Sequence, residues 1–363
     1  APSCARVAAR AAAGEAANVG ILGASGYTGA ECCRLLAQHP GLNIKLMTAE
    51  RHAGEGLEKC FPSLRAQADG LPTMVSVKDA DFSDIDCVFC CLPHGTTQEI
   101  IAGLPEHVKV VDLSADFRLA DIETYAQWYG APHAAPDLQK EAVYGLTELA
   151  REEVKGARLV ANPGCYPTCI QLPLNPLLSA GLIRPDGIII DAKSGTSGAG
   201  RAAKEMTLYC EVTDGINAYG ITAHRHVPEI EQGMVAALGG DADVKVSFTP
   251  HLMPMSRGML ATSYVNMAEG VSVGDLRAHL QKQYADEHFV IVCDEGVSPA
   301  TRHVRGSNYC VVGVFEDRIP GRAIVISVID NVCKGASGQA LQNMNLVMGF
   351  EETTGLMMQP LFP

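Results

Sequence analysis

The 363 residues of the chain suffice for two domains with separate cores, and although 47% of them are hydrophobic, no apolar run approaches the roughly 20 residues that span a bilayer. The 28 Lys and Arg residues against 41 Asp and Glu residues give a formal net charge of −13 without a basic stripe, so we expect neither nucleic acid nor a membrane as a partner. The 13 Cys residues, odd in number and often inside apolar runs, predict a reducing compartment rather than a disulfide framework.

The first 17 residues, APSCARVAARAAAGEAA, are rich in Ala and Arg and have no acidic residue before Glu15. This composition fits the remnant of an organellar transit peptide, and it equally fits a disordered or artificial end. In either case we expect residues 1–17 to lie outside the fold.

From Asn18 onward, short apolar runs alternate with helix-like segments. Such alternation is typical of parallel βαβ units, so it predicts a parallel sheet covered by helices. The apolar runs are Val19–Leu22, Ile44–Met47, Cys87–Leu92, Val108–Leu113 and Leu159–Ala161.

A glycine loop, Gly23-Ala24-Ser25-Gly26-Tyr27-Thr28-Gly29, directly follows the first of these runs and precedes a helix-like segment. Glycines at a spacing of three let the main chain turn tightly, admit a pyrophosphate and let the helix pack closely. The spacing is a variant of the dinucleotide fingerprint and predicts a cofactor site, with a purely structural turn as the alternative.

Glu50 and Arg51, near the end of the second apolar run, give opposite indications about the cofactor. An acidic residue at this place binds the ribose 2′-hydroxyl of NAD, whereas an Arg accommodates the 2′-phosphate of NADP. We favour NADPH, and the alternative is an Arg51 that lies at the surface without a ligand.

Cys165 stands between two prolines, in Asn162-Pro163-Gly164-Cys165-Tyr166-Pro167-Thr168. Because it follows an apolar run and precedes a helix-like segment, we expect it at a helix N-terminus, with Pro167 in the first turn. That position lowers the pKa of a thiol and offers N–H groups to an oxyanion, which suits an acyl-transfer nucleophile. The alternatives are a buried structural cysteine and a metal pair with Cys169, for which no second matching pair exists.

A thiolate nucleophile needs a proton partner, and Ala223-His224-Arg225-His226-Val227-Pro228-Glu229 offers two histidines and a carboxylate. The same side chains suit a metal by type, and ordinary core or surface roles are the third possibility. We favour acid–base chemistry and expect no metal.

After Cys165 the pattern changes to longer β-like runs separated by turn residues. Val244–Pro250 and Met259–Met267 look like one antiparallel pair. Tyr309–Phe315 and Ala323–Ile329 look like another, joined by a Pro-Gly turn.

Two amphipathic helices complete the pattern. Val273–Glu287 carries Leu276, Leu280 and Tyr284 every fourth residue, so we expect it to cover the antiparallel sheet. Ser337–Phe350 has no partner strand after it, and we expect it to pack back on the first domain.

Taken together, the motifs closely resemble the N-acetyl-γ-glutamyl-phosphate reductase family, which is related to the aspartate-semialdehyde dehydrogenases. The likeness runs from about Asn18 to the C-terminus. One departure is Cys91, where the family more often has a small residue, and we interpret it as a tolerated strand residue. The motifs, in chain order, are Gly23 to Gly29, Leu92 to Gly95, Leu113 to Arg118, Asn162 to Thr168, Lys193 to Arg201, His224 to Glu229 and Asn331 to Ala340.

The resemblance implies an α/β fold made of two domains. Residues 18–164 and 334–363 would form an NADP-binding Rossmann domain that the C-terminal helix completes. Residues 165–333 would form a catalytic domain like that of glyceraldehyde-3-phosphate dehydrogenase, with a mixed, largely antiparallel sheet that mediates assembly into a homo-oligomer, a dimer or a tetramer.

The resemblance also implies roles for single residues, carried over motif by motif. Cys165 would be the nucleophile and His224 its acid–base partner. The residues implied to line the substrate site are Ser114, Arg118, Ser194, Ser197, Arg201 and His226. Those implied to contact NADP(H) are Gly23, Ser25, Gly26, Tyr27, Thr28, Gly29, Arg51, Pro93 and Asn331.

The implied reaction is the NADPH-dependent reduction of N-acetyl-L-glutamyl 5-phosphate to the 5-semialdehyde through a Cys165 thioester, with release of phosphate, in arginine biosynthesis. The alternatives are a reductase of another acyl phosphate, of the aspartate-semialdehyde dehydrogenase type, a non-catalytic NADPH sensor, and a zinc protein that uses His224 and His226. The N-terminal composition and the resemblance together suggest the plastid stroma, with the cytoplasm as the other location.

Overall fold

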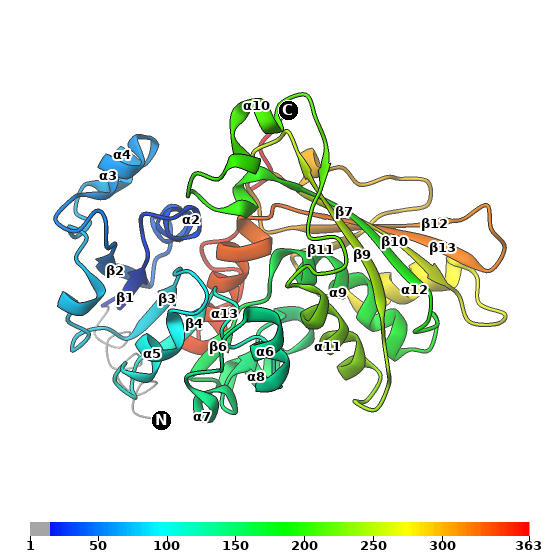
Figure 1. The fold of residues 1–363 in the computed structure, drawn as a ribbon, viewed down its shortest axis with the longest axis horizontal. Coiled ribbons are helices and arrows are strands. Elements are labelled where there is room, and N and C mark those ends of the chain that lie inside the picture. The colour runs from blue at the N-terminus through cyan, green and yellow to red at the C-terminus, as the bar shows by residue number, and fades with distance from the viewer. Residues whose placement is uncertain (1–14, 363) are drawn as a thin grey trace. The chain divides into compact units, whose positions relative to one another are not determined.

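The computed structural model describes residues 15–362, which divide into two compact units (Figure 1). Unit 1 contains residues 15–163 and Ala336–Met357, and unit 2 contains Gly164–Gly335 and residues 358–362. Of the N-terminal segment predicted to lie outside the fold, residues 1–14 fall outside the described range. Ala17 already belongs to the first strand, because its N–H donates to the Gly41 carbonyl at 2.9 Å.

Unit 1 is built on a six-stranded parallel sheet, which confirms the predicted βαβ pattern. The four central strands are buried on both faces, as expected for a parallel sheet between helices, whereas the two edge strands are partly exposed. In sheet order they are β2 (Leu42–Thr48), β1 (Ala17–Leu22), β3 (Cys87–Cys90), β4 (Lys109–Asp112), β6 (Leu159–Ala161) and β5 (Val143–Tyr144).

Helix α13 (Gly338–Met348) returns to unit 1 as predicted and packs against α2 (Tyr27–Leu36), α8 (Arg151–Gly156) and β4. It is buried on all sides, and the amide of Asn343 donates to the Gly145 carbonyl at 2.8 Å. The other helices of the unit are α3 (Leu57–Cys60), α4 (Arg65–Ala68), α5 (Thr97–Ala102), α6 (Ile122–Tyr129) and α7 (Pro136–Gln139).

Unit 2 contains a seven-stranded mixed sheet in which four of the six neighbouring pairs are antiparallel. This agrees with the mixed, largely antiparallel sheet that the sequence predicts. In sheet order the strands are β11 (Val290–Val292), β12 (Cys310–Glu316), β13 (Arg322–Ile329), β10 (Met259–Asn266), β7 (Ile188–Gly195), β9 (Val246–Met253) and β8 (Asn217–Ala218).

The pairing within this sheet confirms one of the two predicted hairpins and corrects the other. β12 and β13 pair antiparallel across the Pro-Gly turn. β9 and β10 do not pair with each other, because β7 lies between them, parallel to β9 and antiparallel to β10. Two runs that are neighbours in the sequence therefore became second neighbours in the sheet.

One face of the seven-stranded sheet is covered by helices. α9 (Cys165–Ser179) packs against β10 and β13, α11 (Val227–Ala237) against β9, and α12 (Val273–Gln283) against β11 and β12. Side chains on the opposite face alternate with the buried ones and remain half exposed. A further single turn of helix is α10 (Tyr209–Val212).

The residues at 358–362 differ from the expected domain division, which assigned them to the first domain. They pack with unit 2, where the N–H of Leu361 donates to the Arg305 carbonyl at 2.8 Å and the Leu361 side chain lies beside Gly306. A terminal segment of this kind carries no periodicity from which its partner could be predicted.

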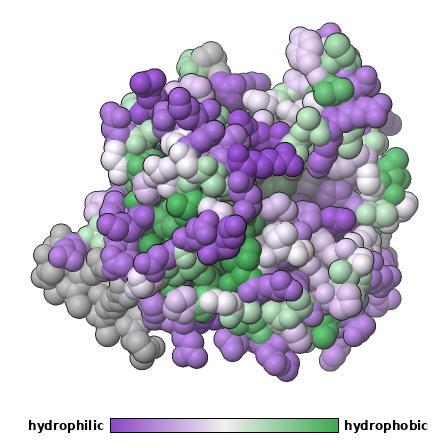
Figure 2. All heavy atoms as spheres, turned by 60° about the vertical axis from the view of Figure 1, so that its left-hand side comes forward, coloured by the Kyte–Doolittle hydropathy of each residue, from purple (hydrophilic) through white to green (hydrophobic). Residues whose placement is uncertain are grey.

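Hydrophilic side chains cover most of the face drawn in Figure 2, with hydrophobic ones in smaller groups between them. Among residues 15–362, none of the helices combines the length and the apolar character needed to cross a membrane. Over the same range the cysteines form no disulfide.

Gly29 yields a stability prediction. A Cβ at this position would overlap the Gly23 carbonyl oxygen and lie 2.7 Å from the Ala24 Cα, both main-chain atoms that cannot rotate away. Gly29→Ala should therefore lower the free energy of unfolding by about 1–3 kcal/mol. Gly156→Ala in α8 is the matched control, since nothing lies within 4 Å of its Cβ. Urea unfolding of both variants measures the difference, and equal stability would contradict the crowding at Gly29.

Candidate active site

Cys165 is the first residue of α9, and Gly164 is its N-cap, which confirms the predicted helix start. The thiol is half buried, Pro167 lies in the first turn, and no acidic residue is present there. The N–H of Gly164 donates to the carboxylate of Glu229 at 2.8 Å, and that carboxylate is 1% exposed. The main chain immediately before Cys165 is thus fixed by a charge-assisted hydrogen bond.

The two histidines lie in an aromatic cluster at the start of α11. The ring of His224 makes edge contacts with Tyr166, the residue after Cys165, at 5.6 Å between centroids, and with His226 at 4.9 Å. Phe248 and Tyr219 complete the surroundings of His224 at 5.3 and 5.5 Å. The sequence-predicted pair of His224 and His226 is therefore packed around the residue next to the candidate nucleophile.

Burial, and to a smaller extent the neighbouring Arg225, lowers the pKa of His224 to about 4. Its Nδ1 accepts a hydrogen bond from the N–H of His226 at 3.1 Å, which fixes the lone pair on Nδ1 and the ring orientation. At neutral pH the imidazole is therefore neutral, which is the form that acts as a proton acceptor in general base catalysis.

Two phenols, the buried Tyr166 and the half-buried Tyr219, lie near the thiol. The Tyr219 hydroxyl donates to the Tyr166 hydroxyl at 3.1 Å. Burial raises the pKa of Tyr219 to about 12 and that of Tyr166 further, and the negative charge that Cys165 carries as a thiolate acts in the same direction on both. Both phenols are therefore neutral donors beside Cys165.

Gly335 packs closely against Cys165, although the two residues lie at opposite ends of the segment Gly164–Gly335 in the sequence. A Cβ on this glycine would lie 2.8 Å from the Cys165 Cβ and 3.1 Å from the Ile329 Cδ1. Only glycine allows the segment after β13 to come this close to the candidate nucleophile.

The predicted loop at Ser194 to Arg201 is anchored to the strand end that carries Asn331. The Asn331 amide donates to the Ser197 hydroxyl at 2.9 Å and its oxygen accepts from the Gly258 N–H at 2.8 Å. The Ser194 hydroxyl donates to the Gly195 carbonyl and is buried, whereas Arg201 is exposed. Asn331 thus holds the loop in this structure, although the resemblance assigns it to the cofactor.

The glycine loop of unit 1 lies at the carboxyl end of β1, where the strand order reverses between β1 and β3. Gly23 has a φ of +86°, and a Cβ there would lie 2.5 Å from the Cys91 carbonyl oxygen. Gly26 is the N-cap of α2, whose first turn lacks an acidic residue. A reversal point with a bare helix N-terminus is where open α/β sheets bind dinucleotides, so the residues fit the predicted cofactor.

The loop after β2 separates the roles of Glu50 and Arg51. The Glu50 carboxylate accepts a hydrogen bond from the Val77 N–H at 2.9 Å, so it braces a neighbouring segment. Arg51 is exposed, and its side chain makes no ion pair or hydrogen bond with any residue between 15 and 362. This arrangement favours Arg51 as a partner of the 2′-phosphate of NADP over Glu50 as a partner of the ribose 2′-hydroxyl of NAD.

The loops after β3 and β4 are joined by Asp116, which is fully buried. Its carboxylate accepts from the N–H groups of Gly95 and Thr97 at 2.7 and 3.0 Å. Pro93 is exposed at the start of this loop. The Ser114 hydroxyl donates to Asp112 at 2.6 Å, and burial raises the pKa of Asp112 to about 6.

Arg118 is 9% exposed and is directed mainly at the main chain. Its Nε and Nη2 donate to the carbonyls of Asn162 and Leu113, both at 2.8 Å. In this structure the guanidinium therefore links the main chain after β4 to the main chain after β6. The predicted contact with substrate would come in addition to these two hydrogen bonds.

Sequence reasoning missed three residues that order these loops, namely Glu229, Gly335 and Asp116. Each belongs to a motif that was noticed, but its task depends on a partner far away in the sequence. Cys91, interpreted as a strand residue, is the first residue after β3, and its Sγ lies 3.9 Å from that of Cys32.

The matches to family models follow the same division as the fold. Residues 18–157 match the NAD binding domain of semialdehyde dehydrogenases, and residues 165–331 match the semialdehyde dehydrogenase dimerisation domain. Together they cover most of the chain, so the chain belongs to the semialdehyde dehydrogenase family.

Relatives within this family narrow the comparison. The chain is 66% identical over 346 residues to a chloroplastic protein of Arabidopsis thaliana described as a probable N-acetyl-γ-glutamyl-phosphate reductase, covering 95% of this chain and 85% of the relative. It is 58% identical over 354 residues to the N-acetyl-γ-glutamyl-phosphate reductase of Rhodospirillum rubrum, covering 96% and 99%. The aspartate semialdehyde dehydrogenase of Candida albicans, solved with NADP, shares the fold with a TM-score of 0.65 at 18% identity, covering 92% and 98%.

The half-buried position of His224 yields a pH prediction. With a pKa of about 4, the ring should stay neutral throughout the range between pH 5 and 8 in which an ordinary His titrates. NMR titration of labelled histidines in the intact chain, with His224→Gln for assignment, measures this. Arg225→Gln should raise the pKa by removing a positive charge, while burial still keeps it below 6.5. A midpoint near 6.5 in the unaltered chain would contradict the account.

Proposed function

We propose that this chain reduces N-acetyl-L-glutamyl 5-phosphate to N-acetyl-L-glutamate 5-semialdehyde and phosphate, with NADPH as the reductant, in arginine biosynthesis. The observation that carries the proposal is Cys165 at the uncapped start of α9, with a neutral His224 packed against the next residue, Tyr166. The names of the relatives at 66% and 58% identity supply the substrate.

Cys165 acts as the acyl carrier. Its Sγ forms a bond to the acyl carbon, the carbon–oxygen bond to phosphate breaks, and phosphate departs with the electron pair. N–H groups in the first turn of α9, which have no acceptor within the helix, stabilise the negative charge on the carbonyl oxygen. Because the nucleophile is itself the first residue of the helix, the attacking sulfur and the N–H groups that stabilise the oxyanion are held at a fixed distance from each other.

His224 moves the protons. As a neutral ring it accepts the thiol proton of Cys165 on Nδ1, which then gives up its hydrogen bond from the His226 N–H. Because the low pKa makes the imidazolium a strong acid, the ring readily passes a proton on to the hemithioacetal oxygen. When the thiolate leaves that hemithioacetal, the ring of His224, neutral again, takes the hydroxyl proton, and the aldehyde is freed.

The cofactor site belongs to unit 1. When bound, NADPH supplies the hydride that reduces the thioester. Residues 23–29 at the start of α2 would hold the pyrophosphate, and Arg51 would pair with the 2′-phosphate. Pro93 would border the same site. Asn331 would act on the cofactor indirectly, by holding the loop that contains Ser197.

The remaining predicted residues are proposed to bind the substrate. Ser194, Ser197 and Arg201 would receive the phosphate, His226 would lie beside the acyl group, and Ser114 with Arg118 would position the carboxylate end. The proposed location is the plastid stroma, in line with the chloroplastic Arabidopsis relative. The half-exposed face of the seven-stranded sheet, within the matched dimerisation domain, is the proposed contact of a homo-oligomer.

Phosphate-dependent reduction of NADP⁺ by N-acetylglutamate 5-semialdehyde tests the function directly. Parallel reactions with aspartate semialdehyde and with NAD⁺ separate the rival readings. Activity with the acetylated substrate alone supports the proposal, activity with aspartate semialdehyde favours the other reductase, and activity with neither favours a sensor.

Cys165→Ser and His224→Asn should differ in severity. Loss of the thiol removes the acyl carrier, so Cys165→Ser should abolish turnover. Loss of the imidazole removes only proton transfer and should lower kcat on the order of 10²–10⁴-fold. Steady-state kinetics on both variants, with Cys210→Ser as an exposed-thiol control, compares them, and substantial turnover by Cys165→Ser would refute the thioester route.

Arg51→Gln should raise the KM for NADPH roughly tenfold or more, since a charged hydrogen-bond partner of the 2′-phosphate is lost, and should leave the KM for NADH unchanged. Glu50→Gln is the control, because the amide oxygen can still accept from the Val77 N–H. If Glu50→Gln changed the KM for NADH and Arg51→Gln changed neither constant, the acidic residue would be the one that meets the ribose.

A further inference from the structure

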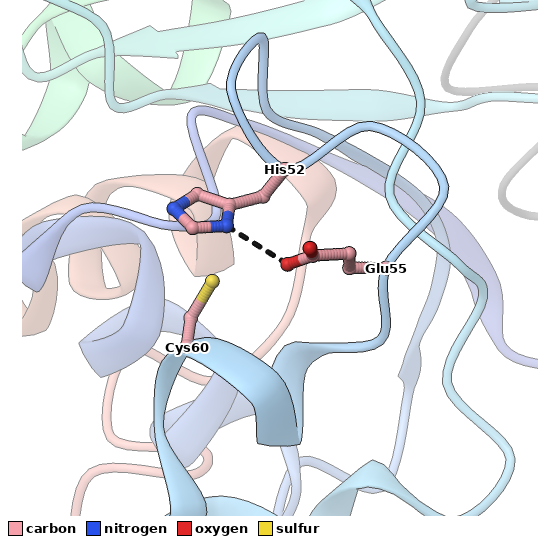
Figure 3. Close-up of side chains that lie close together, drawn as sticks. All are labelled: His52, Glu55 and Cys60. Atoms are coloured by element: carbon pink, nitrogen blue, oxygen red, sulfur yellow. Dashed lines mark hydrogen bonds and ion pairs between the residues drawn. The ribbon is translucent and has the colours of Figure 1, made fainter.

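Three side chains that commonly bind metals lie together in the segment after β2, apart from the residues assigned above. His52, Glu55 and Cys60 each direct one ligand atom toward the others, and these atoms all lie within 4.8 Å of one another (Figure 3). The His52 Nδ1 and the Glu55 Oε2 are 2.9 Å apart. Nitrogen, oxygen and sulfur donors thus meet within nine residues of sequence.

The main chain holds two of these ligands in place. The N–H of Glu55 donates to the His52 carbonyl at 3.1 Å and closes a turn, in which Gly54 adopts a φ of +88°. Met74 pairs with this turn on both sides, accepting from the Gly54 N–H at 2.8 Å and donating to the Glu55 carbonyl at 3.0 Å. Because Met74 is fully buried, the turn is fastened to the core of unit 1.

The third ligand comes from a different element. Cys60 ends α3 and is 6% exposed, and Leu57 of the same turn of helix is 1% exposed. The His52 and Glu55 side chains are 35% and 47% exposed. The thiol therefore approaches from the protein interior and the other two ligands from the solvent side, which leaves one side open to water.

We propose that His52, Glu55 and Cys60 bind one zinc ion. Zinc prefers four-coordinate sites made of Cys sulfur, His nitrogen and carboxylate oxygen, and water completes a set of three protein ligands. Ordinary zinc bonds of about 2.0–2.3 Å at tetrahedral angles place donor atoms roughly 3.3–3.6 Å apart. The nitrogen and oxygen need to separate slightly and the sulfur to close in by side-chain rotation, with the anchored main chain unchanged.

Binding also balances in protons. The Cys60 thiol releases its proton to solvent and binds as a thiolate. The hydrogen that the His52 Nδ1 donates to Glu55 leaves this nitrogen, so that the ring binds through the Nδ1 lone pair and carries its hydrogen on Nε2. The ion replaces the hydrogen bond between His52 and Glu55 and cross-links the turn to α3. None of the three ligands takes part in the reductase reaction proposed above, although His52 directly follows Arg51.

The test uses the full-length chain carrying Cys165→Ser, so that the candidate nucleophile cannot bind metal. After removal of metals by a chelator, Co²⁺ is titrated as the probe and its thiolate charge-transfer absorption is recorded, and Zn²⁺ then displaces it. We expect one ion per chain and a rise in Tm on zinc addition. Absence of any bound ion at micromolar concentrations would overturn the proposal.

Ligand variants in the same background locate the site. Cys60→Ser should remove the charge-transfer band, and His52→Ala and Glu55→Gln, at exposed side chains that folding does not require, should each weaken zinc binding at least about tenfold. Cys210→Ser, at an exposed cysteine elsewhere, should bind like the background. Unchanged affinity in both His52→Ala and Glu55→Gln, or a band that persists in Cys60→Ser, would place the ion elsewhere and refute the assignment.

Discussion

The arrangement of the candidate active site depends on one hydrogen bond, from the Gly164 N–H to the buried Glu229 carboxylate. A carboxylate that is 1% exposed needs donors, and here it finds one at the start of α9. The main-chain oxygen of Glu229 also accepts a hydrogen bond from the Gln171 amide at 2.9 Å. Glu229 of α11 therefore binds α9 at two places, at its start and near its middle. Cys165 follows Gly164 at the start of α9, and the two histidines come just before α11, which carries Glu229. The hydrogen bond between the two helix starts therefore fixes the position of the thiol relative to the imidazoles.

Close main-chain approach is the second constraint, and glycine meets it in both units. Gly335 lets the segment after β13 touch Cys165, and Gly29 lets α2 pack onto the turn that begins at Gly23. In both places the atom that a Cβ would meet belongs to a candidate site, namely Cys165 at the start of α9 in one case and the glycine loop in the other. The chain passes between units after Pro163 and after Gly335, so Cys165 and the glycine that packs on it each lie beside a crossing.

Local sequence patterns were enough to predict most of the fold and the candidate nucleophile. They did not predict the contacts that hold the site residues in place. The apolar runs located β1 to β4 and β6, and the prolines around Cys165 located the start of α9, because strand burial and helix initiation are decided by neighbouring residues. The partners of β9 and β10 were mispredicted, since β7, which separates them, comes from a distant part of the chain. Likewise, no local pattern could reveal that Arg118 serves the carbonyls of Asn162 and Leu113, or that Glu50 serves the N–H of Val77.

The helices of this chain fall into two kinds by how their N-termini are satisfied. α6 begins at Asp121, whose carboxylate accepts from two N–H groups of its first turn, and α12 begins with a capping box between Ser272 and Asp275. α2 and α9 have neither a side-chain cap nor an acidic residue in the first turn. An acidic cap would neutralise the positive end of the helix dipole, whereas a bare end keeps it available to an anion. Among the described residues, α13 and the single turn α4 also begin without a side-chain cap or an acidic residue in the first turn. Of the helices with bare starts, α2 and α9 are the ones that begin at the glycine loop and at Cys165, so these two starts keep the positive field that a pyrophosphate or a thiolate requires.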